Sequence, residues 1–160
     1  MEKYRTNIMY WEVSGILFIL FLGSALHFLF AWTNRWMPIA LIAAVNESVW
    51  EHLKMVFWPG LIFIFISFCF LRKKTPTFWE AKILGLLSMP LIIIILFYAY
   101  HFVFTAHNLA FDILIFVLAV ITGQWISFRL MLKSQFPRYS KPIVILVLLL
   151  TILAFSLFSF

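Results

Sequence analysis

The sequence contains little cysteine and little charge. A single cysteine, Cys69, occurs in 160 residues, which rules out an internal disulfide and a cysteine pair for a metal. Charged residues are 11% of the chain, and only six residues are Asp or Glu. If the protein binds a metal ion, histidine and carboxylate side chains must therefore hold it.

The chain also lacks internal repeats, low-complexity segments and linkers. It is instead rich in apolar residues: 65% are hydrophobic, 20% are aromatic, and the mean hydropathy is +1.07. The net charge of +6 sits in short clusters between apolar runs, a pattern that orients membrane proteins. We therefore expect a membrane protein in contact with lipid, and no binding of nucleic acid.

The apolar runs predict an all-α integral membrane bundle of about five transmembrane helices, forming a single domain over residues 1–160. We place the spans at about 11–32, 48–71, 79–100, 108–128 and 142–160. The first run is longer than a signal-peptide core and has no small-residue cleavage site, so we expect it to be retained. Residues 37–45 are apolar but too few to cross, which predicts a short interfacial or re-entrant segment.

Basic residues near the ends of the spans predict the orientation. Lys and Arg are concentrated around residues 3–5, 72–82 and 129–141, which fall on one side of the predicted topology. Only Arg35 and Lys54 fall on the other side. Because cytoplasmic loops carry the excess of Lys and Arg, we expect a cell-membrane protein with a cytoplasmic N-terminus and an extracytoplasmic C-terminus.

One polar run, residues 46–54, interrupts the apolar sequence. It carries two carboxylates, an imidazole and an ammonium within nine residues. The predicted topology places this run, all the histidines and one further acid, Asp112, toward the outer side. Because ionisable groups are costly in a membrane and usually face a partner or a cavity, this convergence predicts a shared polar site.

Histidine nitrogens together with carboxylate oxygens suit zinc or another divalent metal. On a helix, Glu47 and Glu51 would share a face with Lys54. The spacing matches neither His-Glu-x-x-His nor Glu-x-x-His, so no known motif identifies a metal. Our candidate set is Glu47 and Glu51 as catalytic carboxylates, with His27, His52 and Asp112 as metal ligands. Further polar candidates are Asn46, Ser48, Lys54, His101, His107, Asn108 and Gln124.

Each of these residues also has a purely structural interpretation. Ser48-x-x-Glu51 has the spacing of a capping box, in which the hydroxyl accepts from a first-turn amide and the carboxylate reaches back to the cap amide. Lys54 would then simply pair with Glu51. His27 and Gln124 would bond across helices, Asp112 would oppose a helix dipole, and His101 and His107 would be solvated loop residues. We interpret Glu12, Glu80 and Lys82 as anchors at the inner interface.

The run Val45-Asn46-Glu47-Ser48-Val49-Trp50-Glu51-His52-Leu53-Lys54 resembles one found in a family of uncharacterised small bacterial membrane proteins. A Leu26-His27-Phe28 element before it, and Asp112 with Gly123-Gln124 after it, fit the same pattern. The resemblance implies a bacterial cell membrane and directs attention to His27, Glu47, Glu51, His52 and Asp112. The connection from His101 to His107 departs from the family pattern, so the resemblance does not extend to those histidines.

Three functions remain open at this stage. The first is a membrane-embedded metal-dependent hydrolase acting on a lipid or lipid-linked substrate, in which the metal activates water. The second is a small ion- or proton-coupled transporter, for which the inner half offers little beyond Gln124. The third is a non-catalytic membrane partner subunit. The sequence identifies neither a reaction nor a protein partner.

Overall fold

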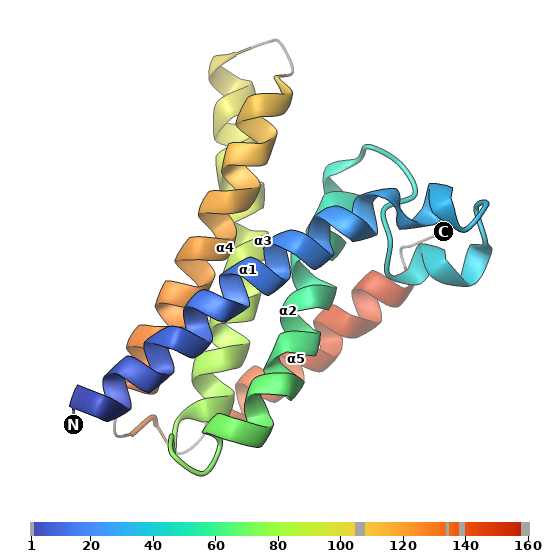
Figure 1. The fold of residues 1–160 in the computed structure, drawn as a ribbon. Helices are drawn as coiled ribbons and strands as arrows, with labels where there is room; N and C mark the ends of the chain where they lie inside the picture. Colours follow the sequence, from blue (N-terminus) through green and yellow to red (C-terminus); the bar gives the residue numbers. More distant parts are fainter. Residues whose placement is uncertain (1, 105–107, 134, 138–139, 158–160) are drawn as a thin grey trace.

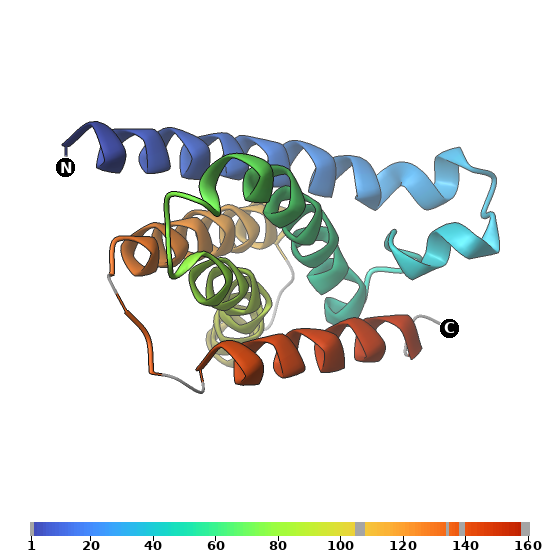
Figure 2. The ribbon, with the colours of Figure 1, turned by 90° about the horizontal axis from the view of Figure 1, so that it is seen from below.

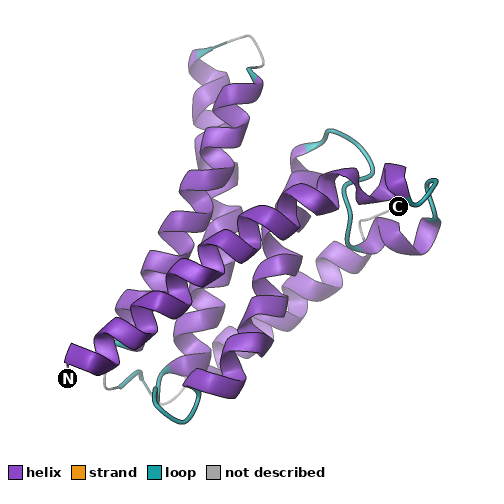
Figure 3. Ribbon diagram, in the orientation of Figure 1, coloured by secondary structure: helices purple, strands orange, loops and turns teal. Residues whose placement is uncertain are grey.

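The computed structural model describes residues 2–104, 108–133, 135–137 and 140–157, which form helices joined by loops, with no strand among them (Figure 3). The long helices are α1 (Glu2–Trp32), α2 (Val49–Leu71), α3 (Phe78–Val103), α4 (Leu109–Met131) and α5 (Ser140–Leu157), and a 3-10 helix, η1 (Met37–Leu41), follows α1. All five long helices in the described residues are long and apolar enough to span a membrane. The predicted all-α bundle is confirmed, and the chain is a multi-pass membrane protein.

The helices diverge toward one end of the bundle. α3 and α4 run side by side, and their far ends project away from the other helices (Figure 1). α1 packs on α2 and α4, while α1 and α5 lie on opposite sides of the molecule with the remaining helices between them (Figure 2). We call the end with the start of α1 and the α2–α3 loop the basal end. The opposite end, with residues 33–48, is the open end.

α1 begins at Glu2 rather than near residue 11 because tertiary contacts hold its first turns. Ile8 is fully buried, and the hydroxyl of Tyr4 donates to Thr75 Oγ1 in the α2–α3 loop at 3.3 Å. The additional turns make α1 longer than a bilayer requires. Residues in the middle of α1 therefore lie deeper in the bundle than the sequence suggests.

The chain reverses sharply after α1. Asn34 and Arg35 both adopt positive φ, at 54° and 58°, which is uncommon for residues other than glycine. The short apolar segment that follows forms η1, with Pro38 in its first turn. Residues 42–48 then lead from η1 to α2 without regular helical structure. Every polar residue of this connection lies at the open end.

α3 and α4 approach most closely at two glycines. A Cβ atom on Gly85 would lie 2.7 Å from the Gly123 carbonyl oxygen, and one on Gly123 would lie 2.8 Å from the Gly85 carbonyl oxygen. Neither backbone oxygen can move aside cheaply, so only glycine fits at either position. Such small-residue contacts are a common way for membrane helices to associate. α3 and α4 therefore form a closely packed pair.

α5 buries little of its surface, and it packs on α3 and, through Phe155, on the beginning of α2. Phe155 packs against Trp50 and Phe57 of α2, with ring centroids 4.8 Å apart in each case. The opposite face of α5 is apolar and exposed, as expected for a helix that faces lipid. The last helix therefore supports the beginning of α2, where the polar run lies.

Candidate functional site

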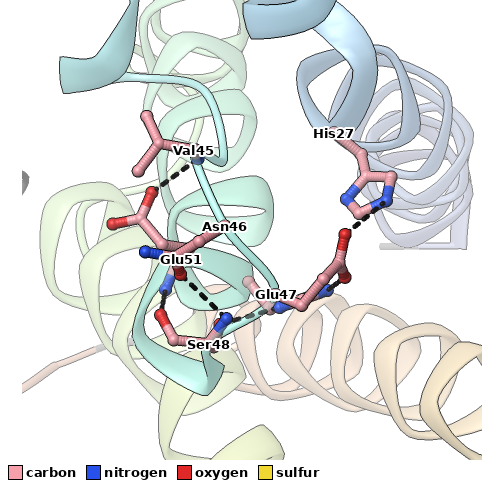
Figure 4. Close-up of polar contacts among 7 residues, drawn as sticks. His27, Val45, Asn46, Glu47, Ser48 and Glu51 are labelled. Atoms are coloured by element: carbon pink, nitrogen blue, oxygen red, sulfur yellow. Dashed lines mark hydrogen bonds and ion pairs between the residues drawn. The ribbon is translucent and has the colours of Figure 1, made fainter.

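Two histidines and a glutamate meet at the open end. Glu47, in the loop before α2, lies between His27 of α1 and His52 of α2. Its two carboxylate oxygens are 3.8 Å from His27 Nε2 and 3.4 Å from His52 Nε2. One ligand atom from each residue lies within 4.8 Å of the other two. Figure 4 shows the Glu47 carboxylate turned toward His27.

A backbone contact indicates which ring nitrogen of His52 carries the hydrogen. Its Nδ1 is 2.8 Å from the carbonyl oxygen of Ser48. A carbonyl oxygen can only accept, so Nδ1 carries the hydrogen and donates it. In a neutral ring, Nε2 then has a lone pair directed at a carboxylate, which is repulsive. A cation between Nε2 and Glu47 would remove this repulsion.

The spacing of the three residues fits a metal ion. Ligands at zinc bond lengths of roughly 2.0–2.1 Å lie about 3.4 Å apart in a tetrahedron. The Glu47–His52 distance already has this value, and the Glu47–His27 distance of 3.8 Å is close to it. Two histidines and one glutamate would also leave a fourth position open, as catalytic zinc sites do. The bond from His52 to Ser48 is the kind of outer contact that orients a metal ligand.

Glu51, the other carboxylate of the polar run, makes different contacts. It forms an ion pair with Lys54 at 2.6 Å, and both side chains are buried. Glu51 Oε2 also accepts from the Val45 amide at 2.9 Å, and Lys54 Nζ donates to the Ala40 carbonyl of η1 at 2.8 Å. Figure 4 shows Glu51 directed at Val45, on the other side of the loop from His27. The pair fixes the loop that carries Glu47.

The capping box predicted from the sequence is formed only in part. Ser48 is the cap of α2 and its hydroxyl accepts from the Glu51 amide, as predicted. The Glu51 carboxylate does not return to the Ser48 amide, because that amide donates to Asn46 Oδ1 at 2.9 Å. The carboxylate reaches Val45 instead. Since α2 begins at Val49, Glu47 precedes the helix and does not share a helical face with Glu51 and Lys54.

Asp112 of α4 faces the same group of residues across a cavity. This helix cavity has a volume of about 350 Å³ and lies between α1, α2, α3 and α4. His27, Glu47, His52 and Asp112 form its polar lining. Asp112 Oδ1 is buried and has no hydrogen-bond partner among the described residues. His27 Nδ1 is also buried without such a partner. An unpaired buried carboxylate oxygen is costly, which is typical of functional positions.

The remaining candidates lie outside this group. Asn108 caps α4, its side chain accepting from the Ala110 amide at 2.9 Å. His101 is in the last turns of α3 and packs against Phe97, with ring centroids 4.3 Å apart. Gln124 is buried in the middle of α4, where a Cβ atom on Gly15 of α1 would collide with its amide. His107 lies outside the described residues.

A second buried ion pair lies toward the basal end. Glu12 of α1 and Lys82 of α3 are 2.6 Å apart, with side chains only 5% and 2% exposed. Glu12, Glu80 and Lys82, which we interpret as anchors at the inner interface, are all buried against other helices. Sequence analysis missed this pair, whose signal is one acid and one base in separate apolar runs.

The fold and these contacts define the class: a multi-pass membrane protein with a His/Glu/His group where its helices diverge. The whole chain, residues 1–160, matches the model of DUF6512, a family of unknown function, and the chain belongs to this family. No curated protein and no solved structure matches it.

Proposed function

We propose that His27, Glu47 and His52 bind a divalent cation, with zinc the best match, and that the protein is a membrane-embedded hydrolase acting on a lipid or lipid-linked substrate. The observation that carries the proposal is the pair of contacts made by His52. Its Nδ1 donates to Ser48, while its Nε2 is 3.4 Å from a carboxylate. A cation between Nε2 and Glu47 satisfies both groups at once.

Asp112 is the general base in this proposal. A bound cation lowers the pKa of a coordinated water and polarises the group under attack. Asp112 lines the same helix cavity and has a buried oxygen without a hydrogen-bond partner among the described residues, and it would take the proton of that water. The water oxygen bonds to the carbonyl carbon or phosphorus, the bond to the leaving oxygen breaks, and Asp112 returns the proton to that oxygen. No further reactant is needed.

The membrane position of the site favours a lipid over a soluble substrate. The helix cavity lies between helices that are long and apolar enough to span the bilayer. The distribution of Lys and Arg supports a cytoplasmic N-terminus in the cell membrane, and the site then belongs to the outer leaflet. A substrate dissolved in the bilayer would reach it without crossing water.

Removal of His52 should weaken metal binding strongly. We expect His52→Ala to weaken zinc affinity by at least about tenfold to 100-fold, the range found when a residue that only orients a ligand is removed. The protein would be purified in neutral detergent, stripped with a chelator and reloaded with zinc. Bound metal would then be measured by mass spectrometry. His101→Ala, which removes a histidine outside the group, is the matched control.

Two results would decide against the site. Wild-type protein that retains no zinc after reloading would contradict the proposed metal site. Equal metal content in His52→Ala and wild-type protein would place the metal elsewhere.

A transporter is the second candidate, and the Glu12–Lys82 pair favours it. The pair supplies titratable groups in the basal half, beside a cavity of about 10 Å³ lined by Lys82 and Gln124. This is about the space of one water molecule. Met89 lines this small cavity and Ile93 lines the helix cavity, one turn or ~6 Å further along α3. One apolar layer therefore separates two polar regions.

Proton flux tests the transporter directly. In proteoliposomes holding a pH-sensitive dye and an imposed membrane potential, a proton-coupled carrier should acidify the lumen faster than protein-free liposomes do. The Glu12→Gln/Lys82→Met double variant removes both charges together and should eliminate the difference. Identical rates for wild-type protein, double variant and empty liposomes would exclude uncoupled proton transfer through this pair.

A further inference from the structure

A second cavity adjoins the first at the His/Glu/His group. This loop cavity has a volume of about 530 Å³ and lies between the last turns of α1 and residues 44–47. His27 and Glu47 line both cavities, and no other described residue does. The two side chains therefore form the boundary between two spaces, one among the helices and one beneath the loop.

The two cavities differ in chemistry. Away from its polar group, the helix cavity is lined by Ile93, Phe97, Leu109, Ile115 and Phe116. The loop cavity is lined by Phe28, Phe30 and Ala31 of α1, and on its polar side by Arg35, Asn46 and the chain around Ala44 and Val45. A hydrocarbon chain is stabilised in the first space, and a polar group with hydrogen-bond acceptors is stabilised in the second.

Arg35 is the cation of the loop cavity. It follows Asn34 in a turn where both residues have positive φ, and its amide donates to the Phe30 carbonyl at 2.9 Å. Its guanidinium forms no salt bridge among the described residues, although it borders a cavity containing Glu47. Left-handed residues commonly end helices, so this turn caps α1 and fixes the backbone of Arg35. A guanidinium with free donors matches the geometry of a phosphate group.

We propose that the substrate is an anionic phosphate-bearing lipid, with its phosphate bound by Arg35 in the loop cavity and its chain in the helix cavity. The part of the lipid between its chain and its headgroup then lies beside His27 and Glu47. This assignment rests on the proposed hydrolase, because it names the substrate of the same site. It adds Arg35 as the residue that selects an anionic headgroup.

Two lipids that differ only in the phosphate provide the test. Protein in neutral detergent with a chelator, which prevents turnover, would be offered dioleoyl phosphatidic acid or dioleoylglycerol, and bound lipid counted by native mass spectrometry. Wild-type protein should retain phosphatidic acid about tenfold better, since a charged hydrogen bond is lost with the phosphate. Arg35→Gln should remove the preference and Arg35→Lys should keep part of it. Arg72→Gln changes an exposed arginine at the basal end and should leave the preference unchanged.

An unchanged preference in Arg35→Gln would overturn the assignment, and so would equal retention of both lipids by wild-type protein. Excess inorganic phosphate should leave the lipid bound, because it lacks the chain. If phosphate alone displaced it, the site would be one for a free anion. Loss of the Arg35 effect with zinc binding intact refutes only the lipid assignment. Loss of zinc binding with the Arg35 effect intact refutes only the hydrolase.

Discussion

Lys54→Met should destabilise the protein by about 3–5 kcal/mol, the cost of leaving a buried charge without its partner. Lys54 is fully buried and pairs with Glu51, whose side chain is 4% exposed. The substitution also removes the donor to the Ala40 carbonyl, so η1 and the loop carrying Glu47 lose their attachment to α2. We expect lower zinc affinity as well, although Lys54 is not a proposed ligand. Unfolding by SDS in mixed micelles, followed by circular dichroism, measures the first effect.

A double variant separates the lost charge from the lost packing. Glu51→Gln/Lys54→Met has no buried charge at this position, and Gln retains an acceptor for the Val45 amide. It should recover most of the stability, as replaced buried pairs often do. Lys74→Met, at an exposed lysine of the α2–α3 loop, should have almost no effect. If Lys54→Met were as stable as wild-type protein, the pair would not be what fixes the loop.

Lys82→Met should also have a large effect. Its expected result is failed folding in the membrane. Glu12 would be left unpaired in the middle of α1, where a charge is costly. We expect the yield of monodisperse protein, measured by fluorescence-detected size-exclusion chromatography, to fall several-fold. Lys141→Met, at an exposed position in the first turn of α5, should behave as wild-type protein does.

The neutral double variant is the decisive comparison here too. Glu12→Gln/Lys82→Met should restore the yield, because no unpaired charge remains. If the double variant were as poorly folded as Lys82→Met, the loss would come from the shape of the lysine side chain. Its stem would then be filling the space beside Phe63, whose ring centre is 5.1 Å from the ammonium.

The helices could be predicted because apolar length alone determines them. The second span ends at Leu71, as predicted, since Arg72, Lys73 and Lys74 follow it. The first helix was placed too late, because its early turns are stabilised by contacts with a loop some 70 residues away, such as Tyr4 with Thr75. Local hydropathy carries no information about such contacts.

The candidate site was predictable only in outline. Topology puts His27, His52 and the polar run at one end, and the structure brings both histidines together with Glu47. The sequence did not predict that Glu47 would lie between the histidines while Glu51 pairs with Lys54. This difference depends on where α2 begins. Helical spacing applied from residue 47 groups the two carboxylates, whereas the cap at Ser48 separates them.

The pairing of Glu12 with Lys82 was beyond the sequence for a related reason. Depth along a helix follows from its first residue, and α1 begins at Glu2. Ten residues at about 1.5 Å each carry Glu12 roughly 15 Å into the bundle. An estimate that begins the span at residue 11 leaves the same carboxylate at the surface.

The contact between Phe155 and the start of α2 has a consequence for biosynthesis. Helices enter the membrane in the order of their translation, so Trp50 and Phe57 of α2 are inserted before α5. Until α5 arrives, their rings have only lipid to face on that side. The polar run at the start of α2 therefore acquires its full support only once α5 has been inserted. A nascent chain halted before Phe155 would hold every histidine of the site while its second helix still lacked a neighbour.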